Sequence, residues 1–468
     1  MHLSLLFLLP LAAAPLTVGQ SDFCDAACQG AYDADFAQES ADWVSDVTTD
    51  PFYASPVNIT AKPGSLIRWQ DVPSAQLAGN FTIPAGLSLS RFIYVSEDID
   101  GTRIAASAYA LLPYTQTETT ADSCGTKQFC TVVFAHGTAG NNPNCAPSNQ
   151  RALYYDWEGP LMIASSGFAV IGPDYAGLGA HRPNSLRYMA GYLHAGDVAY
   201  ALMAARSSPI GSLLSQEWVV AGHSEGGMTA WRVNERLALA DQSSLRNRTG
   251  EFLGAVAAAP AMRAYKQPPP MGREPQPQEK SGDKDDAMFG TPYPVMVFEA
   301  YSEAFPNDIK PEDYLTDLAL ARLKMNKGCY GTTAALFENL SKEQIFKNMS
   351  WEQSPRLVEW STEWVRAGIW ELAAPMLVVS GLEDPITRGT LDSAVNAACA
   401  RFPESIIQSI KLPGLSHDEC FQASQPIYLR WIRERFDRAP VQGCSAETMK
   451  PATNSFGMVQ ISWTGTGL

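Results

Sequence analysis

Basic residues are scarce in this chain. Its 468 residues include 34 Lys and Arg against 49 Asp and Glu, which gives a formal net charge of −15 at pH 7. Nucleic acids and anionic lipid surfaces are bound chiefly through Lys and Arg, so an acidic surface repels them. We therefore expect no nucleic-acid partner and no polyanionic substrate.

The chain also lacks long apolar runs. The stretch at its N-terminus is apolar but short. Residues 4–14 are mostly Leu, Phe and Ala, too few to span a bilayer, and the small residues Thr17 and Gly19 follow at the spacing of a cleavage site. We expect residues 1–19 to be a secretory signal peptide, with a buried N-terminal helix as the alternative. No later run approaches the length of about eighteen apolar residues that marks a membrane span. The mature protein should therefore be soluble and secreted.

Cysteines in metal-binding spacing are also missing. The nine cysteines lie scattered downstream of residue 19, with no Cys-X-X-Cys pair followed by a matching Cys or His pair. We therefore expect no metal site. In an oxidising compartment most cysteines should form disulfides, and the odd number leaves at least one without a partner in the chain. Spacing favours the local pairs Cys24 with Cys28 and Cys124 with Cys130.

Five Asn-X-Ser/Thr sequons accompany the cysteines. A eukaryotic secretory route could glycosylate their asparagines, although each single sequon is a short pattern. The candidate acceptors are Asn58, Asn80, Asn247, Asn339 and Asn348.

Short apolar runs alternate with helical segments through the first half of the chain. Runs over residues 131–135, 168–172 and 218–222 have the composition of strands buried on both faces, and a long helix is expected over about 194–207. Strands over 91–96 and 104–113 should flank a turn. This alternation is typical of an α/β fold with a mostly parallel central sheet.

The alternation stops after residue 260. Residues 266–294 hold seven prolines and a charged cluster, and helical segments rich in Trp, Leu and Phe follow before a strand pattern returns near residue 375. The chain is also long for one compact domain. We expect an irregular N-terminal extension over 20–90, a first core part over 91–260, an inserted, mainly helical cap over 261–372, and a second core part with a C-terminal tail over 373–468. The cap would cover the carboxyl edge of the sheet, where ligands bind in such folds.

The central motif is Gly-His-Ser-Glu-Gly at residues 222–226. It follows a predicted strand and precedes a predicted helix. A serine on such a turn is held outward, and the small glycines tolerate the strained backbone and its close neighbours. We predict that Ser224 is a catalytic nucleophile.

Scarcity of histidine then identifies the base. The chain has six histidines, and only His417 follows Ser224. Folds of this kind place the nucleophile, the acid and the histidine in that order. His417 is therefore the predicted general base, unless it is only a solvated loop residue.

The predicted acid is Asp384, which follows the strand over residues 376–380 and precedes Pro385. Glu383 is its neighbour, and the sequence barely separates the two carboxylates. Asp392 and Asp418 are expected to lie at the surface or to cap helices.

An oxyanion hole needs two backbone N–H donors. One is expected from Glu225, the residue after the nucleophile. The other is expected from the glycine-rich loop that follows residues 131–135, where we choose Thr138. The alternative is a glycine-rich turn without a catalytic role. His136 should fix this loop rather than act as a second base.

Four segments carry a family resemblance. They are Phe134-Ala-His-Gly-Thr-Ala-Gly140, Asn144-Cys-Ala-Pro-Ser148, Gly172-Pro-Asp-Tyr-Ala-Gly-Leu-Gly179 and Gly222-His-Ser-Glu-Gly-Gly227. Together they resemble the secretory lipase family of fungi and bacteria, the group related to the Candida antarctica A-type lipase. The resemblance covers roughly residues 85–445.

This resemblance implies an α/β-hydrolase core with a cap inserted before the strand that bears the acid, and lipase or esterase activity. It also implies a disulfide between Cys399 and Cys444, and a bond between Cys145 and Cys329 would tie the core to the cap. The proline-rich stretch over 266–294 departs from the family, so the resemblance does not extend to lid geometry or to long-chain lipid specificity.

Taken together, the sequence predicts a secreted carboxylic ester hydrolase, a lipase or esterase that forms an acyl-enzyme on a small-molecule or lipid ester. We expect a monomer without cofactor or metal, with transient contact to a lipid interface through the cap. Three alternatives stay open: a carbohydrate esterase that removes acetyl or feruloyl groups, a secreted serine peptidase, and a non-catalytic binding protein on a hydrolase scaffold.

Overall fold

The computed structural model describes residues 23–56, 58–116, 123–125, 127–180, 186–262 and 290–452. The predicted signal peptide, most of the proline-rich stretch and the end of the C-terminal tail lie outside the described residues. Within the described ranges, no helix has both the length and the apolar character needed to cross a membrane.

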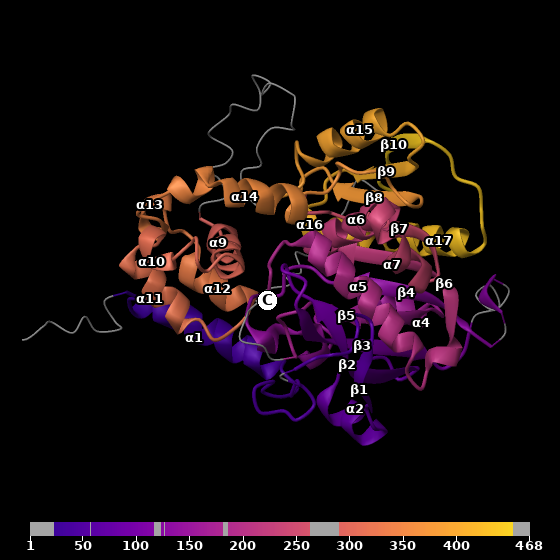
Figure 1. Cartoon of the computed structure of the whole chain (residues 1–468), viewed down its shortest axis with the longest axis horizontal. Coiled ribbons are helices and arrows are strands. Elements are labelled where there is room, and N and C mark those ends of the chain that lie inside the picture. The colour runs from indigo at the N-terminus through magenta and orange to yellow at the C-terminus, as the bar shows by residue number, and fades with distance from the viewer. Residues whose placement is uncertain are drawn as a thin grey trace, which may run out of the picture.

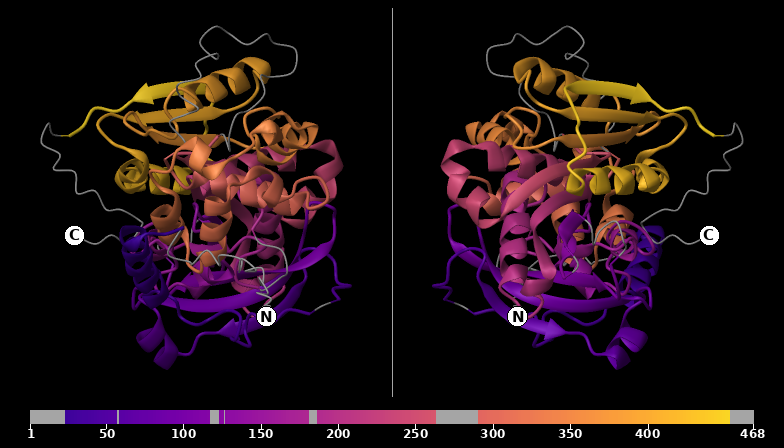
Figure 2. Two further views of the ribbon diagram at one scale, coloured as in Figure 1. Left: turned by 90° about the vertical axis from the view of Figure 1, so that its left-hand side faces the viewer. Right: turned by 90° about the vertical axis from the view of Figure 1, so that its right-hand side faces the viewer.

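One sheet of ten strands organises the molecule, in the order β1-β2-β3-β5-β4-β6-β7-β8-β9-β10. Neighbours from β5 to β10 are parallel, whereas β1, β2, β3 and β5 pair antiparallel. The sheet twists from the N-terminal strands at the bottom of Figure 2 to the C-terminal strands at its top. This confirms the expected α/β fold with a mostly parallel sheet. The strands are β1 (Leu66–Asp71), β2 (Leu87–Glu97), β3 (Arg103–Pro113), β4 (Phe129–Ala135), β5 (Ala169–Pro173), β6 (Leu214–His223), β7 (Glu251–Ala258), β8 (Met376–Gly381), β9 (Ile407–Leu412) and β10 (Cys444–Thr448).

The central strands are apolar because both of their faces are covered. Alternate residues of β4 belong to two different cores: Val133 packs with helices α5 and α6, and Val132 packs with α4 and α17. Helix α15 lies with the first core, and α16 with the second. The helices of the hydrolase core are α4 (Pro160–Ser165), α5 (Gly191–Arg206), α6 (Glu225–Ala238), α7 (Ser243–Arg248), α15 (Leu391–Arg401), α16 (His417–Ala423) and α17 (Gln425–Phe436).

The N-terminal extension is more regular than the sequence suggests. It contains helix α1 (Ala26–Ala41), strand β1 at the edge of the sheet and the short helix α2 (Ser74–Asn80). The expectation of an irregular segment over residues 20–90 is wrong there. Strand β1 is only half-buried along most of its length, so it carries no clear apolar alternation, and its pairing with β2 makes it a strand.

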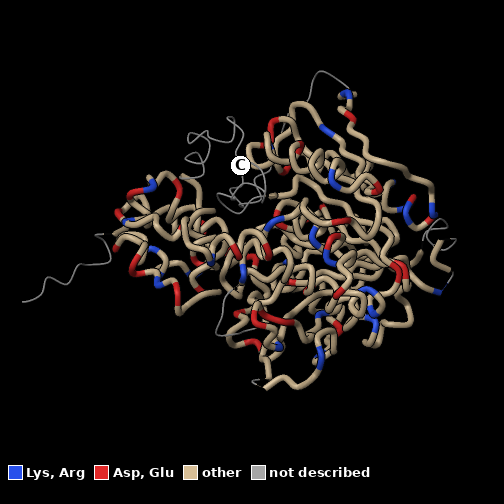
Figure 3. The backbone as a smooth tube through the Cα atoms, turned by 45° about the horizontal axis from the view of Figure 1, so that its top comes forward, with Lys and Arg blue, Asp and Glu red and all other residues tan. Residues whose placement is uncertain are grey.

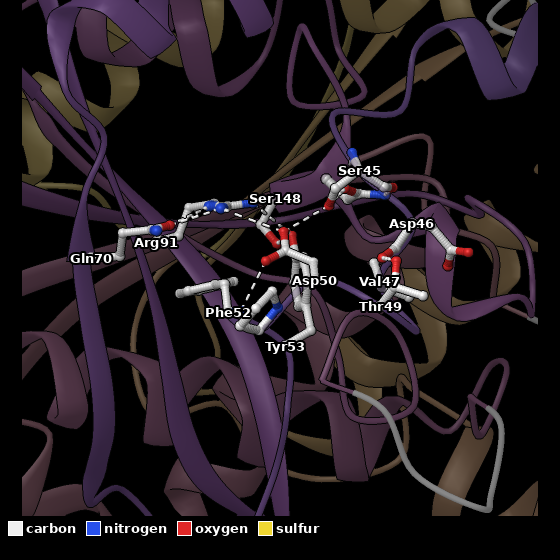
Figure 4. A network of polar contacts seen from close by, with 12 residues as sticks. Ser45, Asp46, Val47, Thr49, Asp50, Phe52, Tyr53, Gln70, Arg91 and Ser148 are labelled. Atoms are coloured by element: carbon white, nitrogen blue, oxygen red, sulfur yellow. Dashed lines mark hydrogen bonds and ion pairs between the residues drawn. The ribbon is translucent and has the colours of Figure 1, made fainter.

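A buried arginine joins this extension to the sheet. Arg91 on β2 donates hydrogen bonds to Gln70 of β1 and lies 4.3 Å above the Phe52 ring, with Asp50 3.8 Å away. Figure 4 shows Arg91 between β1 and the loop that carries Asp50 and Tyr53. Because a buried guanidinium needs acceptors for its N–H groups, this cluster fixes the path of the extension.

Residues 290–372 of the predicted cap are mainly helical, and their helices form a separate group beside the sheet (Figure 1). Its aromatic residues pack on one another: Trp351 is fully buried and its ring lies 5.1 Å from that of Phe298. The helices of this region are short. They are α9 (Tyr293–Ala304), α10 (Pro311–Tyr314), α11 (Asp317–Met325), α12 (Tyr330–Phe337), α13 (Lys342–Ile345), α14 (Pro355–Glu359) and a π-helical turn η8 (Trp360–Val365).

Helix α1 fastens the cap from below in the view of Figure 1. Its residue Glu39 accepts hydrogen bonds from the backbone N–H groups of Cys329 and Gly331, both at 2.6 Å. These N–H groups lie at the start of α12, where a helix has unpaired donors and favours negative charge. The carboxylate of Glu39 therefore caps α12.

Four disulfides join the pairs that the sequence analysis proposes. They are Cys24–Cys28, Cys124–Cys130, Cys145–Cys329 and Cys399–Cys444. The ninth cysteine, Cys420, is free and buried. Of the four bonds, Cys145–Cys329 connects the core to the cap across 184 residues of sequence.

We predict that replacing Cys145 and Cys329 together by Ala lowers the free energy of unfolding by about 2–4 kcal/mol, because a long closed loop restricts the unfolded chain strongly. The matched control removes Cys24–Cys28, which closes a separation of only 4 residues and should cost less. Denaturant unfolding of both double variants measures the difference. Equal losses would contradict the prediction.

Candidate active site

Ser224 lies on a sharp turn between β6 and α6. Its backbone has φ 59° and ψ −119°, a conformation that residues with a side chain rarely adopt. The turn is held by backbone hydrogen bonds to the end of β7: Ser224 N–H donates to Ala258 O at 3.0 Å, and Ser224 O accepts from Ala261 N–H at 3.1 Å. The serine is thus fixed at the carboxyl edge of the sheet.

The glycines around Ser224 are required by space. A Cβ on Gly222 would lie 2.1 Å from Gly226 O, and one on Gly226 would lie 1.9 Å from Ala135 O. Neither contact can be relieved by moving a side chain, because both atoms are backbone. The motif therefore fits β4, β6 and α6 closely together and leaves no room for larger residues.

The structure brings the three predicted catalytic side chains together from separate strand ends. Nε2 of His417 lies 2.8 Å from Ser224 Oγ, and Nδ1 of the same ring lies 2.9 Å from Asp384 Oδ2. Ser224 follows β6, Asp384 follows β8, and His417 starts α16 after β9. In this arrangement His417 can accept the serine proton while Asp384 fixes its ring.

The two neighbouring carboxylates, which the sequence barely separates, point in different directions. Asp384 is fully buried and also accepts hydrogen bonds from Thr387 Oγ1 and Ile386 N–H, both at 2.8 Å. Glu383 instead pairs with Arg388 at 2.5 Å, with more than half of each side chain exposed. Burial by itself raises the pKa of Asp384, but the hydrogen bond and charge of His417 lower it overall. Asp384 is therefore ionised and in place.

An acidic environment surrounds His417. Burial by itself lowers the pKa of His417, but the hydrogen bond and charge of Asp384 raise it above 6.5, and the charges of Asp418 and Glu419 add to the rise. Burial raises the pKa of Asp418 to about 6. The sequence predicts only that Asp418 caps a helix or lies at the surface. It does lie in the first turn of α16, but it also lies 3.6 Å from Nε2 of the buried His223.

The two expected oxyanion-hole residues lie on either side of Ser224. Glu225 is the first residue of α6, so its N–H is one of the donors at a helix start. In the loop after β4, the N–H of Gly137 is taken by Tyr155 Oη at 2.7 Å. Thr138 is the next residue, and Tyr154 donates a hydrogen bond to its carbonyl oxygen. The donor role of the N–H groups of Thr138 and Glu225 stays a prediction.

A buried stack of rings supports this loop. The ring of Tyr175 lies between those of His136 and His194, with both centroid distances 4.1 Å. Tyr175 also donates a hydrogen bond to His136 O, and the His136 ring contacts Gly137 O and Asp174 O. Burial lowers the pKa of His136 to about 4. His136 is thus a neutral residue that fixes the loop.

The Asn-Cys-Ala-Pro-Ser and Asp-Tyr segments meet in the same region. Asp174 is fully buried, and it accepts hydrogen bonds from Ser148 Oγ at 2.6 Å, Ser148 N–H at 2.8 Å and Ser107 Oγ at 2.5 Å. Burial raises its pKa to about 6, against the effect of these hydrogen bonds. These motif residues form a buried scaffold beside the loop that follows β4.

Sequence reasoning missed several residues near the nucleophile. Tyr155, His223 and Asp418 all lie close to His417 or to the loop that follows β4. The neighbours Asp418 and His223 directly follow and precede catalytic candidates in the sequence. In the sequence, the only sign that Asp418 and His223 lie at the site is their adjacency to His417 and Ser224. Adjacency does not determine the direction in which a side chain points.

One group of three side chains among the described residues could hold a metal ion. The donor atoms of His223, His417 and Asp418 lie within 4.8 Å of one another. Both ring nitrogens of His417 already lie within hydrogen-bond distance of Ser224 or Asp384, so an ion here would have to displace one of them. The geometry fits a serine nucleophile with its base better than a resident metal.

The acid of the triad can be tested against its neighbour. We predict that Asp384→Asn lowers kcat on the order of 10⁴-fold, because the amide holds the His417 ring in the wrong tautomer. Glu383→Gln should leave kcat close to that of the wild type, since Glu383 faces solvent. Steady-state hydrolysis of an activated ester measures kcat for both variants. A larger loss of kcat in Glu383→Gln than in Asp384→Asn would make Glu383 the acid of the triad.

The acidic surroundings of His417 predict a shift in pH dependence. His417 must be neutral to accept a proton, so activity should fall as pH drops through its raised pKa. Asp418→Asn removes a negative neighbour and should move this acid limb to lower pH. Glu383→Gln, which pairs with Arg388 at the surface, serves as the control and should leave the limb in place. Profiles of kcat/KM against pH for the wild type and both variants measure the position of the acid limb.

Several solved protein structures are similar to this chain. Candida antarctica lipase A in its closed state has a TM-score of 0.64 at 16% identity, over 85% of this chain and 88% of that one. The Xanthomonas oryzae rice cell wall degrading esterase LipA has a TM-score of 0.57 at 14% identity, over 81% and 100%.

A putative hydrolase from Legionella pneumophila gives a TM-score of 0.55 at 16% identity, over 80% of this chain and 97% of that one. A search of curated proteins finds no match. At these identities the likeness concerns the fold alone. Residues 132–428 match the model of the alpha/beta hydrolase family. Since this match spans more than half of the chain, the protein belongs to the alpha/beta hydrolase family.

Proposed function

We propose that this protein is a secreted serine carboxylic ester hydrolase, a lipase or esterase that works through an acyl-enzyme. The observation that carries the proposal is the hydrogen-bonded line from Ser224 Oγ through His417 to Asp384, with distances of 2.8 Å and 2.9 Å. A strained turn presents the serine, and a buried carboxylate orients its base. These are the features of an activated serine nucleophile.

The proposed reaction has two halves. Ser224 Oγ attacks the ester carbonyl carbon while His417 Nε2 takes the hydroxyl proton, and the N–H groups of Glu225 and Thr138 bind the oxygen that becomes negative. The carbon–oxygen bond to the alcohol then breaks, and the alcohol leaves with the proton from His417. Water attacks the acyl-enzyme by the same path, so that the carboxylic acid leaves and Ser224 regains its proton. No cofactor is needed for these steps.

A second candidate is an esterase that acts on acylated carbohydrates. Tyrosines lie close to Thr138: Tyr188 bonds to its hydroxyl at 2.9 Å, Tyr154 bonds to its carbonyl, and the backbone N–H of Tyr330 in the cap bonds to the adjacent Ala139 O at 3.1 Å. Phenol groups can contact sugar hydroxyls as well as apolar chains. One structural neighbour is described as a cell wall degrading esterase and another as a lipase. Hydrolysis rates on acetylated xylan and on a triglyceride separate the two candidates.

Secretion is part of the proposal. Four disulfides fit an oxidising compartment. The asparagines of all five sequons are exposed, so each is accessible to glycosylation. Lys and Arg lie interspersed with Asp and Glu along the chain in Figure 3, as suits a soluble protein. We also propose cleavage after residue 19, a monomeric state and contact with lipid, as the sequence predicts.

We predict that Ser224→Ala lowers kcat for p-nitrophenyl acetate on the order of 10⁶-fold, because the nucleophile is lost. Labelling by a fluorophosphonate probe should disappear in the same variant, while Ser148→Ala, a buried serine of the scaffold, should keep the label. An unlabelled wild type would favour the binding-protein alternative. Cleavage of aminoacyl amides in preference to esters would favour the peptidase.

A further inference from the structure

The side chain of Glu225 takes no part in the proposed reaction, yet it is buried beside the reacting groups. The residue follows the nucleophile directly and is fully buried. Its Oε1 accepts a hydrogen bond from Met189 N–H at 2.8 Å and lies 3.6 Å from Nδ1 of His194. An acid at this place is costly to bury and costly to ionise next to an oxygen that becomes negative.

The contact with Met189 leads to the other half of the oxyanion hole. Met189 has φ 63°, a left-handed conformation that a residue with a side chain holds only when its surroundings fix it. Its neighbour Tyr188 places its hydroxyl 2.9 Å from Thr138 Oγ1. The side chain of Glu225 thus connects, through Met189 and Tyr188, to the residue expected to give the second N–H donor.

The groups that face Glu225 carry no positive charge at neutral pH. His194, on α5, has its pKa lowered to about 3, mainly by burial. Tyr175, Tyr188 and Tyr154 have their pKa values raised, mainly by burial, and therefore stay neutral. Burial raises the pKa of Glu225 to about 8, although hydrogen bonds from Met189 N–H and the Thr138 hydroxyl oppose the rise. At neutral pH the acid therefore holds its proton.

We propose that Glu225, in its uncharged form, is a positioning residue of the oxyanion hole: its side chain holds the Thr138 donor in place relative to its own N–H. This inference rests on the proposed function and deepens it. When the carboxyl group ionises, its negative charge opposes the charge that develops on the substrate oxygen. Ionisation therefore slows the chemical step and leaves substrate binding less affected.

The test compares kcat and KM across neutral and alkaline pH for wild type, Glu225→Gln and Glu225→Ala. The wild-type kcat should fall as pH rises through about 8, where Glu225 loses its proton. Glu225→Gln keeps the shape of the side chain without its charge, so it should recover most of the kcat that Glu225→Ala loses, and its profile should lack this alkaline limb. Glu225→Ala should lose kcat roughly 10²-fold at every pH, about as much as losing one oxyanion donor, with KM changed less.

Glu158 supplies the matched control, because burial raises its pKa to about 8 as well, with the charge of nearby Asp418 adding to the rise. Glu158→Gln should keep the wild-type alkaline limb. Loss of that limb in Glu158→Gln, or its survival in Glu225→Gln, overturns the inference. If Glu225→Ala does not fold, as judged by thermal unfolding, the Gln variants still decide.

Failure of the proposed function looks different from failure of this inference. A wild-type protein that hydrolyses no ester, or hydrolyses it equally well as Ser224→Ala, would refute the function itself. A wild type that depends on Ser224 but shows the same pH profile as Glu225→Gln would refute only the role of Glu225.

Discussion

The close backbone packing at Ser224 is the constraint on which the site depends. Strand β6 can run directly into α6 only because Gly222 and Gly226 let the backbone of β4 approach without a Cβ between them. The serine then takes a positive φ, and its backbone is tied to the end of β7 by two hydrogen bonds. Because neighbouring strands hold both sides of the turn, its strain cannot relax. His417 and Asp384 meet the serine from two further strand ends.

Around that turn, buried polar groups hold the backbone in position. His136 and His194 are buried with Tyr175 between them, and burial keeps both imidazoles neutral. Asp174 receives three hydrogen bonds where the Asn-Cys-Ala-Pro-Ser segment meets β5. The charged groups lie around His417 instead, where the negative charges of Asp384 and Asp418 both raise the pKa of the imidazole.

The cap depends on the core through a few strong attachments rather than through a shared sheet. Glu39 caps the start of α12, and Cys145–Cys329 fixes the same turn covalently. Near the C-terminal end of the cap, the buried Glu235 of α6 accepts hydrogen bonds from the N–H groups of Gly368 and Ile369. At the start of α12, the N–H of Tyr330 donates a hydrogen bond to Ala139 O, in the loop after β4, at 3.1 Å. The cap is therefore attached to the core in its middle and near its C-terminal end.

The sequence by itself determined the strand-turn-helix around Ser224, the choice of His417 and the buried parallel strands. Each follows from local rules: glycine at a tight turn, one histidine in the required order, and apolar runs that only two covered faces explain. Tertiary structure alone decided between Asp384 and Glu383, because two adjacent residues differ only in which way they point. It also made an edge strand of β1, turned Asp418 toward His223, and buried Glu225 against Met189. Those outcomes depend on partners far away in the chain, and no local pattern encodes such contacts.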